Sequence, residues 1–129
     1  MYRKGSTMER ELVELLWSAG FACIRSAGSG KTRHPNPDIL AANAKAVYAI
    51  ECKSSSKREV RIERSQIDDL VSFSSVFRAD PVVAVRFNHT PWFFLAPDIL
   101  ERVPSGNVKI RFEHAKENGL GFDEFFRKA

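Results

Sequence analysis

Two short apolar runs joined by a polar turn constrain the fold more than any other feature of this sequence. The runs span residues 39–42 and 46–50, and residues 43–45 separate them. Their length and composition predict two buried antiparallel strands, and the polar residues between them predict a tight turn. The chain is therefore expected to build its sheet around a β-hairpin.

This hairpin predicts the position of two acidic side chains. Facing residues of an antiparallel pair have a constant sum of positions, so a turn centred at residues 44–45 places Asp38 opposite Glu51, with Cβ atoms roughly 5 Å apart. Like charges in such positions repel each other unless a cation lies between them. Lys53 shares their face because strand side chains alternate, whereas Cys52 is expected to point into the core. The pattern therefore predicts a cation site with an ammonium group beside it.

Each half of this pattern is common by itself. Asn36, Pro37 and Asp38 form an ordinary turn composition, and Glu-x-Lys occurs by chance in most soluble proteins. Charged residues are expected on solvated faces, yet Glu51 and Lys53 end the most apolar strand candidate in the chain. This context favours a functional site over a chance arrangement.

The distribution of charge favours a polyanionic partner. The 129 residues carry a net charge of +4, and the first 64 residues contribute +5, which leaves −1 for the remainder. The positive charge thus accompanies the carboxylate site, as expected if that site handles a polyanion such as nucleic acid. A chain of this length is expected to form one domain, residues 1–129, with a core that needs no disulfide or structural metal.

Targeting signals and metal-binding cysteine patterns are absent from the sequence. It contains neither an N-terminal signal peptide nor a long apolar span, so we expect an intracellular, cytoplasmic protein without membrane association. Cys23 and Cys52 lie in apolar strand candidates without the His spacing of a zinc site. We expect both to be reduced core residues.

A helix is expected near the N-terminus. Ser6 and Glu9 have the spacing of a capping box, apolar residues continue with helical periodicity to about Ala19, and Gly20 is placed to end the helix. Glu9 lies at the margin of the apolar stripe, so it either caps its own helix, which the local pattern favours, or faces the sheet. Residues 1–6 are expected to form a flexible basic arm.

A basic loop rich in Gly and Ser is expected over residues 27–36, after a short strand at residues 21–26. Lys31 and Arg33 in this loop either cradle phosphate or are ordinary solvated charges. The Gly-Lys-Thr segment does not match a nucleotide-binding P-loop, because no Gly lies five residues before Gly30 and no helix follows. We therefore expect no nucleotide cofactor.

The second half of the chain is expected to supply the remaining strands and helices. Helices are predicted at residues 63–77 and 122–128, and strands at 81–87, 91–95 and 107–112. Arg61 and Arg64 adjoin the start of the first helix, where cations do not favour the helix dipole, which indicates a role besides stability. The strand at 91–95 is apolar on both faces, so it is either central or covered by a partner. The many aromatic residues of this half favour core packing, and a dimer interface explains the rest.

With these segments in place, the chain resembles the archaeal Holliday junction resolvases of the PD-(D/E)xK superfamily, which includes many restriction endonucleases. The matching segments occur in family order and spacing: Arg3-Lys4-Gly5-Ser6, Glu9-Arg10-Glu11-Leu12, Gly20-Phe21, Arg25-Ser26-Ala27-Gly28-Ser29, Pro37-Asp38 and Glu51-Cys52-Lys53-Ser54. The resemblance implies an α/β, restriction-endonuclease-like fold with a mixed five-stranded β-sheet flanked by helices. It also implies a homodimer that makes paired, Mg²⁺-dependent cuts across four-way DNA junctions in recombination and repair, with Mn²⁺ as a substitute.

The resemblance further implies roles for individual residues. Glu9, Asp38 and Glu51 are the implied metal ligands, Lys53 holds the attacking water or stabilises the transition state, and Ser29 is a loop serine needed for cleavage. The expected DNA-binding residues are all basic and all lie in the first 64 residues: Arg3, Lys4, Arg10, Arg25, Lys31, Arg33, Lys57, Arg58 and Arg64.

Other functions stay open at this point. A nuclease of the same fold that cuts linear, flap or damaged DNA has the same motif. A junction-binding protein without catalytic turnover is a second alternative, although retention of all four charged positions argues against it. A phosphate-loop nucleotide hydrolase is a distant third.

Overall fold

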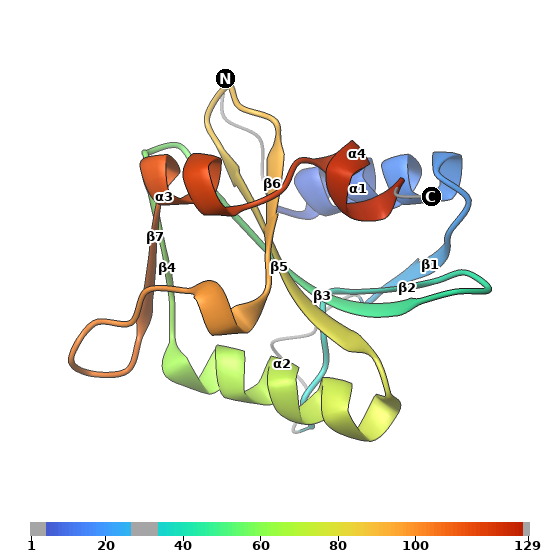
Figure 1. Cartoon of the computed structure of the whole chain (residues 1–129), viewed down its shortest axis with the longest axis horizontal. Coiled ribbons are helices and arrows are strands. Elements are labelled where there is room, and N and C mark those ends of the chain that lie inside the picture. Colours follow the sequence, from blue (N-terminus) through green and yellow to red (C-terminus); the bar gives the residue numbers. More distant parts are fainter. Residues whose placement is uncertain (1–4, 27–33, 128–129) are drawn as a thin grey trace.

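The computed structural model describes residues 5–26 and 34–127 and contains a mixed five-stranded sheet (Figure 1). Its strands, in spatial order, are β1 (Ala22–Arg25), β2 (Ile39–Ala42), β3 (Val47–Ser55), β5 (Asp80–Phe87) and β6 (Trp92–Leu95). β3 and β5 are parallel, and the other neighbours are antiparallel. The expected mixed five-stranded sheet is confirmed.

Helices cover both faces of this sheet. The helical elements are α1 (Gly5–Ser18), α2 (Arg64–Phe77), the 3-10 turn η2 (Pro97–Ile99), α3 (Phe112–Asn118) and α4 (Phe122–Phe126). Figure 1 shows α1 and α4 on one face and α2 on the other. A separate two-stranded sheet pairs β4 (Glu59–Ile62) with β7 (Val108–Arg111) in antiparallel fashion and packs into the same core as α2. Among the described residues, no helix has the length and apolar content that crossing a membrane requires.

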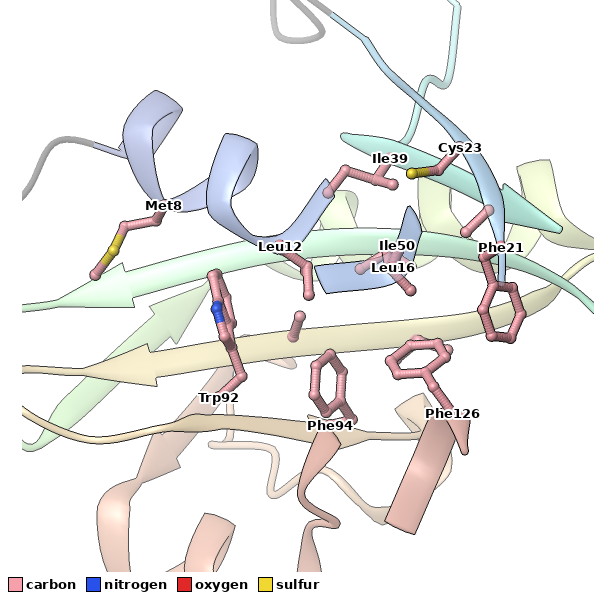
Figure 2. Packing of buried hydrophobic residues seen from close by; sticks show 13 residues of the cluster. Met8, Leu12, Leu16, Phe21, Cys23, Ile39, Ile50, Trp92, Phe94 and Phe126 are labelled. Carbon is pink, nitrogen blue, oxygen red and sulfur yellow. The ribbon is translucent and has the colours of Figure 1, made fainter. Parts of the chain in front are cut away.

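The core consists of two apolar clusters, one on each face of the sheet. In the first, Met8, Leu12 and Leu16 recur along α1 with helical spacing and pack with Ile50 of β3 and Phe126 of α4 (Figure 2). The second cluster joins α2 to the opposite face and to the small sheet: Val60, Ile62, Ile67, Leu70, Val83, Val85, Val108 and Ile110. Burial on both faces explains why the central strands are almost continuously apolar.

The β2–β3 hairpin has the register that the sequence predicts. Ile39 faces Ile50, and every other facing pair has the same sum of positions. The Asn43 side chain closes the turn, because its Oδ1 accepts hydrogen bonds from the backbone N–H groups of Lys45 at 2.8 Å and Ala46 at 2.9 Å. This register determines which residues meet at the open end of the hairpin.

β6 is apolar on both faces because the chain itself covers it. It is the last strand in the sheet order, yet the Phe94 N–H donates to the Leu120 carbonyl at 2.8 Å, and the Leu120 N–H donates back at 3.0 Å. Trp92 and Phe94 pack into the first cluster and Leu95 into the second. The segment before α4 therefore pairs with the β6 edge of the sheet, to which another strand could otherwise bind.

Three features differ from the sequence-based expectations. β3 continues to Ser55, whereas the pattern predicts a polar connector from residue 54. The pattern predicts neither β4, with four residues, nor α3, with seven, because such short elements contain too few apolar positions for a detectable period. α1 begins at Gly5, inside the arm expected over residues 1–6, so part of that segment is helical.

Candidate functional site

Asp38 lies directly before β2, at the open end of the β2–β3 hairpin. Its backbone N–H donates to the carbonyl of Ile50 at 3.0 Å, so Asp38 and Ile39 both lie opposite Ile50 where the β2–β3 ladder ends. This bond is one position off the register that pairs Asp38 with Glu51, yet the charge of Asp38 acts on Glu51, the next residue of β3. Asp38 is only 8% exposed, and its Oδ2 accepts a hydrogen bond from the backbone N–H of Cys52 at 2.8 Å. The carboxylate is thus held directly against β3.

Glu51 and Lys53 lie on the face of β3 that is opposite Cys52. Cys52 packs against the first core cluster, on the side of α1, whereas Ala49 belongs to the second cluster. Because side chains alternate along a strand, Glu51 and Lys53 share the face of Ala49, and Asp38 is close enough for its charge to act on Glu51. Two carboxylates and an ammonium group therefore meet on one face of the sheet.

The electrostatic environment of Glu51 favours a cation. Burial, followed by the negative charge of Asp38, raises the pKa of Glu51 from 4.5 to about 8, although Lys53 acts in the opposite direction. Two nearby carboxylates repel each other when both are ionised, and the repulsion is stronger where water is largely excluded. A positive ion between them removes this penalty.

Glu9 approaches the pair from α1. Its Oε1 accepts a hydrogen bond from Nε of Arg25 on β1 at 3.1 Å, and both side chains are largely buried. Burial and then the charge of Asp38 raise the pKa of Glu9, whereas Arg25 lowers it. Of the two alternatives for Glu9, the structure therefore has the side chain facing the sheet, near Asp38.

Asp38 and Glu51 are suited to bind a hard divalent ion, but together with Glu9 they do not form a ready-made three-carboxylate metal site. Within residues 5–26 and 34–127, no three His, Cys, Asp or Glu side chains are grouped so that they hold one metal ion. Glu9 is engaged by Arg25. Asp38 and Glu51 offer oxygen donors whose mutual repulsion a cation relieves, and Mg²⁺ prefers one or two carboxylates together with several waters. The donor chemistry of this pair therefore suits Mg²⁺ or Mn²⁺.

Lys53 also lines a groove of about 600 Å³ between the start of α2 and the small β4–β7 sheet. Most of the other lining side chains are polar or charged: Arg61, Glu63, Gln66, Ser105, Asn107 and Lys109. Gln66 is fixed at the helix start, because its Oε1 accepts a hydrogen bond from the Glu63 N–H at 3.2 Å. The carboxylate site is thus continuous, through Lys53, with a mainly basic groove.

Lys109 is a residue of this groove that the sequence pattern does not single out. It faces Arg61 across the antiparallel pair of β4 and β7. The alternation of Val108, Lys109, Ile110 and Arg111 marks Lys109 as outward-facing. Only the tertiary pairing with β4, however, brings it beside Arg61 and towards Lys53.

The described DNA-binding candidates are spread over several elements. Arg10 is exposed on α1, Lys57 is exposed between β3 and β4, and Arg64 begins α2. Arg58 lies over the ring of Phe112, 4.0 Å from its centroid, and is paired with an acidic residue of α3. The candidates that fall outside the described residues are Arg3, Lys4, Ser29, Lys31 and Arg33.

The chain is similar over its whole length to a known protein family. The family model described as "Archaeal holliday junction resolvase (hjc)" matches residues 1–129. The crossover junction endodeoxyribonuclease Hjc of Methanocaldococcus jannaschii is 46% identical over 123 residues, which are 95% of this chain and 86% of the relative. The protein of the same name from Archaeoglobus fulgidus is 39% identical over 110 residues, which are 85% of this chain and 80% of the relative.

The fold is similar to a solved structure of this family. The structure of Archaeoglobus fulgidus Hjc, a Holliday junction resolvase, superimposes with a TM-score of 0.86 at 35% sequence identity, and the match covers 98% of each chain. This likeness confirms the restriction-endonuclease-like fold. Because sequence and fold agree over essentially the entire length, this chain belongs to the archaeal Holliday junction resolvase family.

Proposed function

We propose that this protein is an endonuclease that resolves four-way DNA junctions by paired, metal-dependent cuts during recombination and repair. The observation that carries this proposal is the close carboxylate pair Asp38 and Glu51, with the ammonium group of Lys53 near Glu51. The relatives are named crossover junction endodeoxyribonucleases, which supports the same reaction here. Mg²⁺ is the proposed metal, and Mn²⁺ substitutes for it because both ions prefer oxygen ligands.

Hydrolysis of a phosphodiester requires a nucleophile and neutralisation of the charge that develops at phosphorus. A bound divalent ion supplies both an activated water and positive charge at the reacting phosphate. Asp38 and Glu51 hold and orient that ion. Lys53, on the same face, holds the attacking water or offsets the growing negative charge. The reaction is a hydrolysis, so it needs no nucleotide cofactor.

Glu9 is the proposed third ligand, and Arg25 controls when it becomes available. A DNA phosphate offers Arg25 a charge-assisted partner in place of Glu9. The released Glu9 carboxylate then adds to the negative charge beside Asp38, so that substrate binding completes the metal site. If so, Arg25→Ala weakens junction binding but strengthens Mg²⁺ binding by the free protein, as measured by titration calorimetry. Weaker Mg²⁺ binding by this variant contradicts the step.

The remaining basic candidates are proposed to hold the junction strands by phosphate contacts, which position DNA without reading its sequence. They share a basic side chain, and they are Arg3, Lys4, Arg10, Lys31, Arg33, Lys57, Arg58 and Arg64. Ser29, which lies outside the described residues, is proposed to assist cleavage. The DNA substrate in turn places the protein in the cytoplasm with the chromosome.

We assign the exposed apolar end of α2 to a homodimer interface. Val76 is 86% exposed and Phe77 is 50% exposed, and Phe77 stacks on Phe73 with ring centroids 5.0 Å apart. Together with Pro35 these side chains line an apolar groove. Exposed apolar patches of this kind mark protein contacts. A second copy of the chain is the partner, because two active sites related by a two-fold axis match the symmetry of a four-way junction.

Sedimentation of a Val76→Ser/Phe77→Ser double variant tests the dimer. We expect a monomer that nicks junctions singly, whereas Ile99→Ser, which alters another exposed apolar residue, leaves both mass and paired cutting unchanged. A wild-type protein that is monomeric at junction-binding concentrations contradicts the assignment.

The central experiment compares wild type with Asp38→Asn on four-way and linear DNA at the same Mg²⁺ concentration. We expect Asp38→Asn to bind junctions but not to cut them, and Asp123→Asn, an exposed carboxylate on α4, to behave like wild type. Cutting at the wild-type rate removes Asp38 from the mechanism. Equal cleavage of linear and four-way DNA identifies a different nuclease, and binding without cutting by wild type identifies a non-catalytic junction-binding protein.

A further inference from the structure

Two cations face each other across the small β4–β7 sheet. Arg61 of β4 and Lys109 of β7 are direct cross-strand partners. Like charges in directly opposite positions destabilise a strand pair. Val60 and Ile62 of β4 are buried in the core, so the alternation turns Arg61 to the other face. A pair of cations in this arrangement is a candidate for binding an anion.

The cations are only partly neutralised within the chain. Glu59 contacts both, with its Oε2 3.0 Å from Nε of Arg61 and its Oε1 3.4 Å from Nζ of Lys109. One carboxylate thus serves two cations. The Arg61 side chain is 71% exposed, and an ion pair at that exposure contributes little stability. Stability alone therefore does not account for keeping two cations in facing positions.

The same two cations line the groove that begins at Lys53. The groove also contains the amide of Asn107 and the hydroxyl of Ser105, which are hydrogen-bonding groups suited to a sugar-phosphate backbone. Its volume of about 600 Å³ matches a site for a small ligand. A DNA duplex, whose major groove alone is about 12 Å wide, is too large for it. The groove therefore has room for a short stretch of one strand.

We propose that this groove binds the backbone of the DNA strand being cut, next to the scissile phosphate, through Arg61 and Lys109. Lys53 lies at the junction between the groove and the carboxylate pair, so a strand whose reacting phosphate is at Lys53 continues into the groove. Glu59 competes with the DNA for both cations. This inference rests on the proposed nuclease function and names the path of its substrate.

Junction binding without divalent ions, where no strand is cut, tests the two cations directly. We expect Arg61→Ala/Lys109→Ala to bind a four-way junction about tenfold or more weakly, and the slope of log affinity against log salt to fall by about 1 to 2. The matched double variant Lys45→Ala/Arg127→Ala removes two cations outside the groove and is expected to change neither quantity. Equal losses in the two double variants overturn the proposal.

Glu59→Gln separates DNA binding from a purely structural role of the cluster. If Glu59 competes with DNA, this variant binds the junction more tightly than wild type. If Glu59 only neutralises Arg61 and Lys109, the variant is less stable and its junction affinity is unchanged or lower, which overturns the proposal. Unfolding in urea provides the stability measurement.

Neutral methylphosphonate linkages locate the strand. Placed one or two nucleotides from the cut site, such a linkage is expected to weaken binding by wild type but to cause no further loss in Arg61→Ala/Lys109→Ala. An equal loss in both proteins shows that the contact lies elsewhere and overturns the groove assignment. If wild type cuts no junction at all, the proposed function fails, and the binding experiments still decide whether the groove holds a strand.

Discussion

Two pairs of like charges lie close together in this molecule, and they differ in burial. Asp38 and Glu51 lie at the open end of the β2–β3 hairpin, and Asp38 is 8% exposed. Arg61 and Lys109 lie on the outer face of the β4–β7 sheet, and the Arg61 side chain is 71% exposed. The ammonium group of Lys53 lies near the first pair. The carboxylate of Glu59 contacts both members of the second pair.

This difference indicates what each pair is suited to bind. Coulomb repulsion is strong where water is excluded and weak where solvent screens it. Burial and then the charge of Asp38 therefore raise the pKa of Glu51 to about 8, and the carboxylate pair favours one small, highly charged ion in a defined position. The exposed Arg61 and the partly buried Lys109 beside it favour a flexible polyanion that displaces Glu59. We infer that Asp38 and Glu51 take part in catalysis by holding the metal ion. Arg61 and Lys109 instead bind and position the DNA strand.

The largest expected effect comes from neutralising the buried pair. Glu51→Gln should lower the rate of junction cleavage by at least about 10²- to 10³-fold, the loss typical for one preorganised electrostatic group. Junction affinity should stay within a few-fold of wild type, in contrast to the groove double variant. Single-turnover cleavage and gel-shift assays measure the two effects, with Glu117→Gln on α3 as control. If Glu51→Gln cleaves at a rate near that of wild type, the carboxylate pair is not catalytic, and the inferred difference in role between the two pairs is wrong.

A second effect is the pH dependence of stability without a divalent ion. The pKa of Glu51 is about 8 in the folded protein, and its ordinary value is 4.5. Between pH 4.5 and pH 8, Glu51 therefore keeps its proton in the folded protein but loses it in the unfolded chain. Stability is therefore full below pH 4.5, falls as the pH rises towards 8, and stays low above it. The steepest contribution of one such group is about 1.4 kcal/mol per pH unit.

Urea unfolding of chelator-treated protein at pH 5, 6.5 and 9 checks this window. Glu51→Gln should flatten the decline, and Mg²⁺ at pH 9 should stabilise wild type more than this variant. Glu113→Gln is a control, because the pKa of Glu113 is lowered by hydrogen bonds and its titration lies below the window. If wild type and Glu51→Gln lose stability equally between pH 5 and 9, the carboxylate repulsion is not the cause.

The smallest expected effect is the change in the stability of the protein when a groove cation is removed. Arg61→Ala alone should change the free energy of unfolding by no more than about 0.5 kcal/mol, because the Arg61 side chain is 71% exposed and exposed ion pairs contribute little. Thermal or urea unfolding measures this change. A loss of more than about 2 kcal/mol is typical of a disrupted core and means that this side chain supports the small sheet, not a ligand.

Much of the site was predictable from local pattern because one hairpin contains most of it. The apolar runs and the turn between them determine the register, and this register brings Asp38 to the open end of the hairpin near Glu51, with Lys53 two residues further along β3. The small sheet was not predictable in this way. β4 has four residues, and its partner β7 lies more than 40 residues further along the chain, so nothing local connects Arg61 with Lys109.

Sequence alone determined the central hairpin, the two long helices α1 and α2, and the face of β3 on which Glu51 and Lys53 lie, because periodicity acts over a few neighbouring residues. Tertiary structure decided that Glu9 pairs with Arg25 beside Asp38, that β6 is covered by the chain's own C-terminal segment, and that a basic groove extends from Lys53. These arrangements depend on burial and on charges from distant segments. Such interactions exist only after the chain has packed, since it is packing that excludes water and brings those segments together.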